Sequence, residues 1–172
     1  MNGARDLAVL ELLEKSTTRF YGKYAGTVTE VDEDTMRLRA KVPEVFGDQP
    51  SGWATACVPY AGDGYGIAFL PEPECGVWIE FEGGETSRPI WSGCYWREGE
   101  KPPDAKAAAK VLQTKEGAKI VFDDDEKSIT ISDSNGNEIK IADSGIKLSR
   151  GGMSVEITES SVKINDSSME VT

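Results

Sequence analysis

Short apolar–polar–apolar triplets recur through the last third of the chain, from about residue 120 to residue 172. The outer residues of each triplet are aliphatic or methionine and the middle one is polar, an alternation at period 2 that is typical of β-strands. Ser, Asp, Asn and Gly fill most of the intervals and favour tight turns. The triplets are Ile129-Thr130-Ile131, Ile139-Lys140-Ile141, Ile146-Lys147-Leu148, Val155-Glu156-Ile157, Val162-Lys163-Ile164 and Met169-Glu170-Val171. This pattern predicts a stack of very short strands over residues 120–172.

The apolar residues of these triplets need a core that one chain does not supply. Repeats of seven to ten residues are too short to wrap a core within one chain, whereas three chains around an axis can close one another's edges. We therefore expect an obligate homotrimer in which this region is an intertwined triple-stranded β-helix. The expected trimer core consists of Ile129, Ile131, Ile139, Ile141, Ile146, Leu148, Val155, Ile157, Val162, Ile164, Met169 and Val171. The alternative is an ordinary antiparallel meander in one sheet, whose strands would be shorter than the usual 5–6 residues.

Residues 20–96 show a second β pattern with longer runs. The segment 36–42 alternates cleanly, with apolar residues at even positions and charged residues between them, as in a half-exposed strand. Further runs cover residues 24–31, 53–58, 66–70, 76–81 and 89–95. Five or six strands in about 75 residues, without a convincing internal helix, predict a small closed barrel of the OB type. The expected fold class is therefore all-β, with a barrel followed by the stacked strands.

Two further segments complete the domain organisation. Residues 1–19 contain a short helix over 4–15, on which Leu7, Leu10 and Leu13 form an apolar stripe. That helix either packs on its own domain or docks on a partner. Residues 97–119 are polar and Pro-rich at first and then contain an Ala-rich stretch, Ala105 to Leu112, that favours a helical turn or two. We expect this segment to be a linker and neck between the barrel and a needle over 120–172.

Charge and cysteine content narrow the possible partners. The 172-residue chain has a net charge of −11, which disfavours nucleic acid and anionic lipid headgroups as ligands. Its 3 cysteines are not clustered, so a disulfide framework is not expected and a reducing compartment is favoured. The first residues lack the features of a cleaved signal peptide, and no apolar stretch approaches the ~20 residues of a membrane span.

The residues that support common catalytic mechanisms are missing. The chain contains 0 His, which excludes His-based triads and imidazole acid–base chemistry. No Gly-rich phosphate loop of the Walker type is present. The run from Asp133 to Asn137 has Gly at the fourth position instead of the sixth that an EF-hand requires, so it reads as a plain turn. We therefore expect no enzymatic activity, no cofactor and no metal site.

The order of motifs along the chain resembles the baseplate spike proteins of contractile injection systems, that is, the phage baseplate V and VgrG-like family. In the barrel region the resemblance lies in Gly22 to Val28, Leu38 to Pro43, Trp53-Ala54, Pro59 to Gly62, Phe69 to Pro71, Gly76 to Gly84 and Pro89 to Gly93. In the repeat region it lies in Thr114 to Asp124, Ile129 to Ile131 and Gly136 to Ile141. No single motif is diagnostic, but their order over about 150 residues is specific.

The resemblance implies a trimeric spike at the tip of a contractile tube of the phage-tail or type VI secretion kind, which contacts the target membrane mechanically. Only about 20 residues precede the barrel, so the trimeric hub is expected to be a separate protein, with Leu7, Leu10 and Leu13 as hub-docking candidates. The strands run to the last residues without a pointed cap, so Met169, Val171 and Thr172 are candidates for docking a separate PAAR-like tip protein. The protein is expected to be assembled in the cytoplasm into a phage-tail-like particle and delivered to or through the target envelope. The alternatives are a glycan-binding OB protein on a trimeric β-helical stalk and a passive trimerisation stalk.

Overall fold

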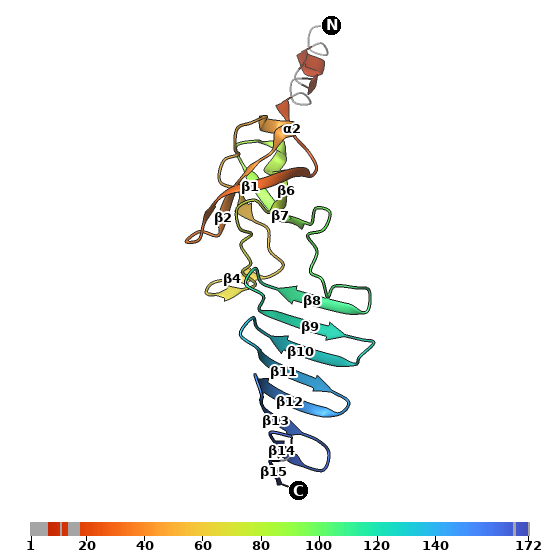
Figure 1. Ribbon diagram of the computed structural model, residues 1–172. Helices are drawn as coiled ribbons and strands as arrows, with labels where there is room; N and C mark the ends of the chain where they lie inside the picture. Colours follow the sequence, from red (N-terminus) through yellow and green to blue (C-terminus); the bar gives the residue numbers. More distant parts are fainter. Residues whose placement is uncertain (1–6, 11, 14–17, 167, 172) are drawn as a thin grey trace. The chain divides into compact units, whose positions relative to one another are not determined.

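The computed structural model describes residues 7–10, 12–13, 18–166 and 168–171, and it divides the chain into two compact units, Met1–Gly99 and Glu100–Thr172 (Figure 1). Most of the described residues lie in strands or in the turns between them. The described residues 7–10, 12–13 and 18 are helical, in agreement with the helix expected near the start of the chain.

The first unit is a five-stranded sheet that closes on itself. Its strands are β1 (Tyr24–Asp32), β2 (Arg37–Lys41), β3 (Thr55–Ala56), β6 (Gly76–Phe81) and β7 (Pro89–Tyr95), in the order β2-β1-β6-β7-β3. Neighbouring strands are antiparallel except β3 and β7, which are parallel. A bridge between Leu38 and Ala54 then joins β2 to the segment that leads into β3. The two outer strands of the sheet thus meet, and the result is the small barrel that the sequence predicted.

The barrel has a closed apolar core. The alternation in β2 places Leu38 and Ala40 at 0% exposure, while Arg37 is exposed and Arg39 and Lys41 are half-buried. The fully or largely buried core residues are Val28, Leu38, Ala40, Val42, Ala54, Val77, Ile79, Phe81 and Trp91. They come from all the long strands, so one chain buries this core without help.

Two local features of the barrel differ from the sequence-based expectations. The run 66–70 was expected to be a strand, but only its first residue is in one: β4 (Ala61–Gly62) and β5 (Tyr65–Gly66) make a small separate hairpin. Residues 67–70 are irregular and are not part of the barrel sheet. A short helix, α2 (Pro43–Phe46), was not expected; it has Pro at its start and Gly47 as its C-cap. After β6 the chain passes through one 3-10 turn, η1 (Glu82–Gly84), before it reaches β7.

The second unit is one sheet of eight strands that follow each other in sequence order (Figure 1). The strands are β8 (Ala109–Gln113), β9 (Lys119–Asp123), β10 (Ser128–Ser132), β11 (Asn137–Ala142), β12 (Gly145–Arg150), β13 (Met153–Ile157), β14 (Val162–Ile164) and β15 (Met169–Val171). Every neighbouring pair is antiparallel. Within one chain, therefore, the strands pair as the meander that was considered as the alternative. The strands between β8 and β15 have both of their neighbours inside the chain, and the winding of three chains around each other stays a prediction.

The sheet begins earlier than the sequence indicated. Ala109–Gln113 was placed in the linker, with a helical turn over 105–112, but it forms β8 and pairs with β9 along its whole length. The preceding segment is fastened to β9 by ion pairs from Lys106 to Asp123 (3.2 Å) and from Lys119 to Asp104 (2.5 Å). The backbone N–H of Asp124 also donates to the carbonyl of Ala108 (2.8 Å). The region expected to be a free linker is therefore partly built into the second unit.

Candidate functional site

The main candidate site is the apolar face of the second sheet. Strand register places its apolar side chains in two columns that run across the strands. One column is Leu112, Ile120, Ile131, Ile139, Leu148, Val155, Ile164 and Met169; the other is Phe122, Ile129, Ile141, Ile146, Ile157, Val162 and Val171. Because side chains alternate between the two faces of a strand, all of these residues share one face. The twelve residues predicted as a trimer core thus lie together in this register.

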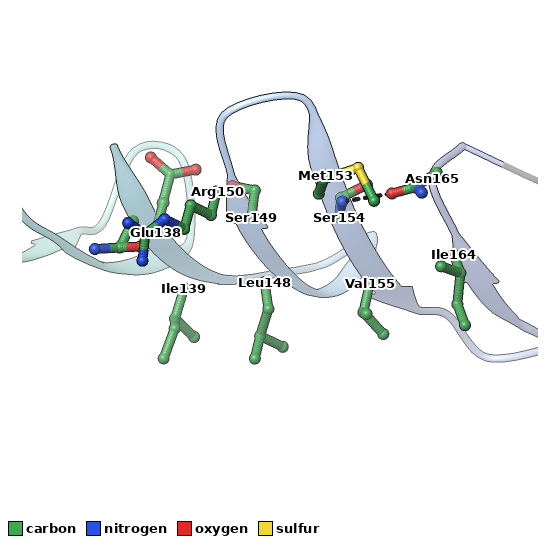
Figure 2. Close-up of a pocket in the computed structure, with 11 residues that line it drawn as sticks. Glu138, Ile139, Leu148, Ser149, Arg150, Met153, Ser154, Val155, Ile164 and Asn165 are labelled. Atoms are coloured by element: carbon green, nitrogen blue, oxygen red, sulfur yellow. Dashed lines mark hydrogen bonds between the residues drawn. The ribbon is translucent and has the colours of Figure 1, made fainter. Parts of the chain in front are cut away.

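These apolar side chains are largely exposed in the single chain. Exposure among the predicted core residues runs from 36% for Ile129 to 44% for Ile131 and Leu148, and it reaches 58% for Met169. The side chain of Val171 lies outside the described part of the structure. A continuous apolar strip of this kind on a protein surface marks an interaction site. Figure 2 shows Ile139, Leu148, Val155 and Ile164 projecting side by side from successive strands into a shallow hollow of this face.

Sequence reasoning missed part of this face. Leu112 (43% exposed), Ile120 and Phe122 (47% exposed) extend the columns by two strands towards the start of the unit. The stacked strands were expected to begin at residue 120, but Ile120 and Phe122 were not counted in the core. Lys110 lies opposite Phe122 and pairs with Asp124. The second apolar column therefore ends at β8, where a charged residue takes the next place.

The opposite face of the sheet holds Val111 and Val121 on β8 and β9 and is mostly polar from β10 onwards. Lys140 lies beside Lys147, Lys147 beside Glu156, and Glu156 beside Lys163. The two Lys–Glu pairs stabilise the sheet modestly, by about 0.2–1 kcal/mol each, whereas the like charges of Lys140 and Lys147 oppose each other. This polar face is suited to contact with water, whereas the apolar face is suited to burial.

Several turns that hold the columns in register are fixed by specific hydrogen bonds. The Asp133 carboxylate accepts from the backbone N–H groups of Asn135 (2.9 Å) and Asn137 (3.0 Å) and from both of their side-chain amides. These bonds, above all the one from the Asn137 amide, lower the pKa of Asp133 to about 2. The arrangement is the plain turn that the sequence predicted.

Glycine is required where β12 begins. Gly145 has φ +134°, and a Cβ built there would lie 2.1 Å from the carbonyl oxygen of Ile157. Any side chain at this position would force β12 and β13 apart. The close approach keeps Ile146 and Ile157 adjacent in the apolar column.

The candidate docking residues at the two ends of the chain are only partly described. Leu7, Leu10 and Leu13 lie in the helical segment and are 68%, 57% and 55% exposed. Thr172 lies outside the described residues. Arg19 fastens the chain that follows the helix to the barrel, because its guanidinium donates to the Gly83 carbonyl (2.9 Å) and pairs with Glu85 (2.6 Å).

Two further features bear on the chemistry of the site. Within the part of the chain that the structure describes, no group of three or more His, Cys, Asp or Glu residues is arranged to hold a metal ion. Among the same residues, no helix is long and apolar enough to cross a membrane. The expectation that the chain is not an enzyme stays a prediction.

Two family models match the chain. Residues 24–96 match the type VI secretion system and phage-baseplate injector OB domain, and residues 109–170 match the phage baseplate V C-terminal trimerisation domain. A comparison with curated proteins finds no match. The first match covers the barrel strands, and the second begins at the first residue of β8 and covers the sheet with the apolar columns. The second match supports a homotrimer, and together the two matches show that the chain belongs to the baseplate spike family.

Proposed function

We propose that the protein is the central spike of a contractile, phage-tail-like injection system. Three copies would bury the apolar faces of their second units around a common axis and form a needle. Sheath contraction would then drive this needle against the target envelope. The observation that carries the proposal is the pair of exposed apolar columns on a sheet whose eight strands pair with one another within the chain.

The physical role of the needle is to transmit force without unfolding. Antiparallel backbone hydrogen bonds link eight strands along each chain. Trimerisation would add a dry apolar core at about 25 cal/mol for each Å² of apolar surface buried. Separation of one chain requires loss of that core along the whole length of the sheet, so the barrier to unfolding is high. The proposed role is mechanical and uses no catalytic group or cofactor.

The two ends of the chain would receive two other proteins. The exposed apolar helix near the start, tied to the barrel through Arg19, is suited to docking on a separate trimeric hub. The last strand, β15, leaves Met169 exposed at the end of an apolar column, and a PAAR-like tip protein would cover that end. Assembly of the particle would take place in the cytoplasm, followed by delivery to or through the target envelope.

The first test is the solution mass of the full chain by light scattering coupled to size exclusion. We expect about three times 18.7 kDa, and we expect this mass to persist in SDS without heating. A monomer at micromolar concentration would overturn the proposed needle.

The hub contact is tested separately, by co-expression with a trimeric hub protein from a contractile system and isolation of the complex. Replacement of Leu7, Leu10 and Leu13 by Ser should abolish the complex and leave the mass of the spike unchanged. Retention of the complex by this variant would show that the hub docks elsewhere.

A further inference from the structure

The second sheet has two sides at which its strands end and turn, and the turns on these two sides differ in charge. We call these two sides edges; the word does not refer here to the outermost strands β8 and β15. The strands alternate in direction, so each turn lies at one of two edges. We call the edge with the turns after β9, β11 and β13 the acidic edge, because its turns hold Asp124, Asp125, Glu126, Asp143 and Glu159 and, among cations, only Lys127. We call the other edge, with the turns after β8, β10, β12 and β14, the arginine edge, because β12 ends there at Arg150. Its turns also hold Lys115, Glu116, Asp133 and Asp166.

Arg150 makes no ion pair or side-chain hydrogen bond within the described part of the chain, and its side chain is exposed. It lies apart from the row of apolar side chains (Figure 2). On the acidic edge, Glu159 is also exposed and without a partner among the described residues. Asp143 has Lys127 as its ion-pair partner, at 3.9 Å, with both side chains at least 73% exposed. One unpaired cation and two weakly satisfied carboxylates therefore lie at opposite edges of the same sheet.

Within one chain these groups cannot meet. β12 runs from Gly145 to Arg150, which separates the edges by about 17 Å at roughly 3.3 Å per residue. Glu116, Glu138 and Asp166 also lie at the arginine edge, and none of them pairs with Arg150 within the described residues. Asp133, in the turn after β10, is already satisfied by four hydrogen bonds in its own turn. It therefore does not compete with the acidic edge for a cation.

Cyclic symmetry brings the two edges together. If three sheets form the three faces of a prism, as the proposed function requires, each corner joins an edge of one copy to the opposite kind of edge of the next copy. The apolar columns run across the strands from one end of the sheet to the other, so the threefold axis must run parallel to the columns. A given residue then lies at the same height along this axis in all three copies. Arg150 at the end of β12 then lies between the turn after β11, which holds Asp143, and the turn after β13, which holds Glu159. Strands are about 4.8 Å apart, and a long arginine side chain spans such offsets.

We propose that Arg150 of one copy pairs with Asp143 and Glu159 of the next copy at each corner of the trimer. The pairing selects parallel, in-register copies. The apolar columns alone are a weak guide to orientation, because they contain similar Ile, Leu and Val side chains over most of their length. Antiparallel packing of two sheets would bury the same columns but move Arg150 to a different height from its acids. A few charges that are satisfied in only one arrangement are a general way to specify it.

Cross-linking tests the geometry directly. A full-length Arg150→Cys/Glu159→Cys variant is treated with a bismaleimide cross-linker about as long as an Arg–Glu pair, because a disulfide requires Cα atoms closer than such a pair places them, and it is run on a denaturing gel next to the wild type and the two single variants. We expect a covalent trimer from the double variant and none from the other three proteins, whose Cys57, Cys75 and Cys94 give the background. Absence of the covalent trimer, when light scattering shows that the double variant is trimeric, would overturn the corner contact and leave the needle standing. A monomeric wild type would instead overturn the needle and this contact together.

Charge exchange tests the energetics. Arg150→Glu should lower the temperature at which the SDS-resistant trimer dissociates. Adding Asp143→Arg and Glu159→Arg to that variant should restore the temperature. Because the edges of one chain are too far apart, restoration identifies contact between copies. If the triple variant is no more resistant than Arg150→Glu, the proposed pairing is wrong.

Discussion

The two units of the chain use the same alternation of apolar and polar residues with opposite results. In the barrel, Leu38, Val77 and Ile79 are 0% exposed, because the sheet curls until its outer strands meet. In the second unit, Ile141 and Ile157 are both 43% exposed, because the sheet is extended by one strand at a time and never meets itself. In the barrel, strands that are distant in the sequence pair with each other, such as β1 with β6, and this pairing closes the sheet. In the second unit each strand pairs only with the strands next to it in the sequence, and the sheet stays open. The difference shows that alternation alone predicts a strand, and that the connections decide whether one chain or several complete the core.

A charged residue on the apolar face of the second sheet is expected to have the largest effect on trimer stability. Ile141→Asp or Ile157→Asp would place three carboxylates in the shared core, and the effective penalty is several kcal/mol for each buried ion. We expect loss of the trimer by light scattering while the barrel keeps its Trp91 environment by fluorescence. Lys140→Asp is the matched control, since it changes the charge one residue away on the polar face and should remain trimeric. A heat-resistant trimer of Ile141→Asp would remove these residues from the core.

Truncation in each unit distinguishes a core within a chain from one between chains. Leu38→Ala should destabilise the barrel by about 2–5 kcal/mol, as large-to-small core substitutions do, by the same amount at every protein concentration. Leu148→Ala should instead lower a melting temperature that depends on protein concentration, because trimer stability follows mass action. Thermal unfolding at two concentrations tenfold apart measures the contrast. A concentration-independent effect of Leu148→Ala would place its core within one chain.

The sequence predicted the repeated strands well. It predicted less well the segments whose structure depends on which strand they pair with. Alternation identified the outer residues of each triplet, and register confirmed that they share two columns. The strand β8 was missed because Ala105 to Ala109 is rich in a strong helix former, and pairing with β9 overrides that preference. The run 66–70 was given a strand on composition alone, although no barrel strand was left to pair with it. α2 had a recognisable signal, Pro43 followed by Gly47, but its four residues are too few to show a helical period.

The edges of the second sheet were not visible in the sequence as sites. Arg150 reads as part of a Gly-rich turn, and its position opposite the acids of a neighbouring copy depends on strand direction and symmetry. The expected docking residues were chosen from the apolar stripe of the first helix and from the uncapped end of the repeated strands, and they stay predictions.

A glycine substitution tests how the open sheet keeps its register. Gly145→Ala should cost about 1–3 kcal/mol, the range for strained backbone positions, because its Cβ would lie 2.1 Å from the Ile157 carbonyl. Gly152→Ala is the control, since a Cβ there meets nothing within 4 Å. The midpoint of urea unfolding, followed by the β signal in circular dichroism, measures both. Equal midpoints for the two variants would contradict the close approach of β12 and β13.

The smallest expected effect is on the pH dependence of stability. It comes from Asp133, in the turn after β10 of the second sheet. The pKa of Asp133 in the folded chain is about 2, below the 3.8 that is usual for an aspartate, so the folded state favours the carboxylate. The stability that it contributes is therefore fully present above about pH 4 and is lost as the pH falls through about 2. Asp133→Asn has nearly the same shape but stays uncharged, and its NH₂ group faces donors where a carboxylate accepts. The difference in urea midpoint between wild type and Asp133→Asn should shrink as the pH falls from 4 to 2, while other pH effects are shared by both proteins. A difference that is constant over this range would mean that the Asp133 charge does not hold the turn, and that the Asn135 and Asn137 backbone conformations are set by the neighbouring strands alone.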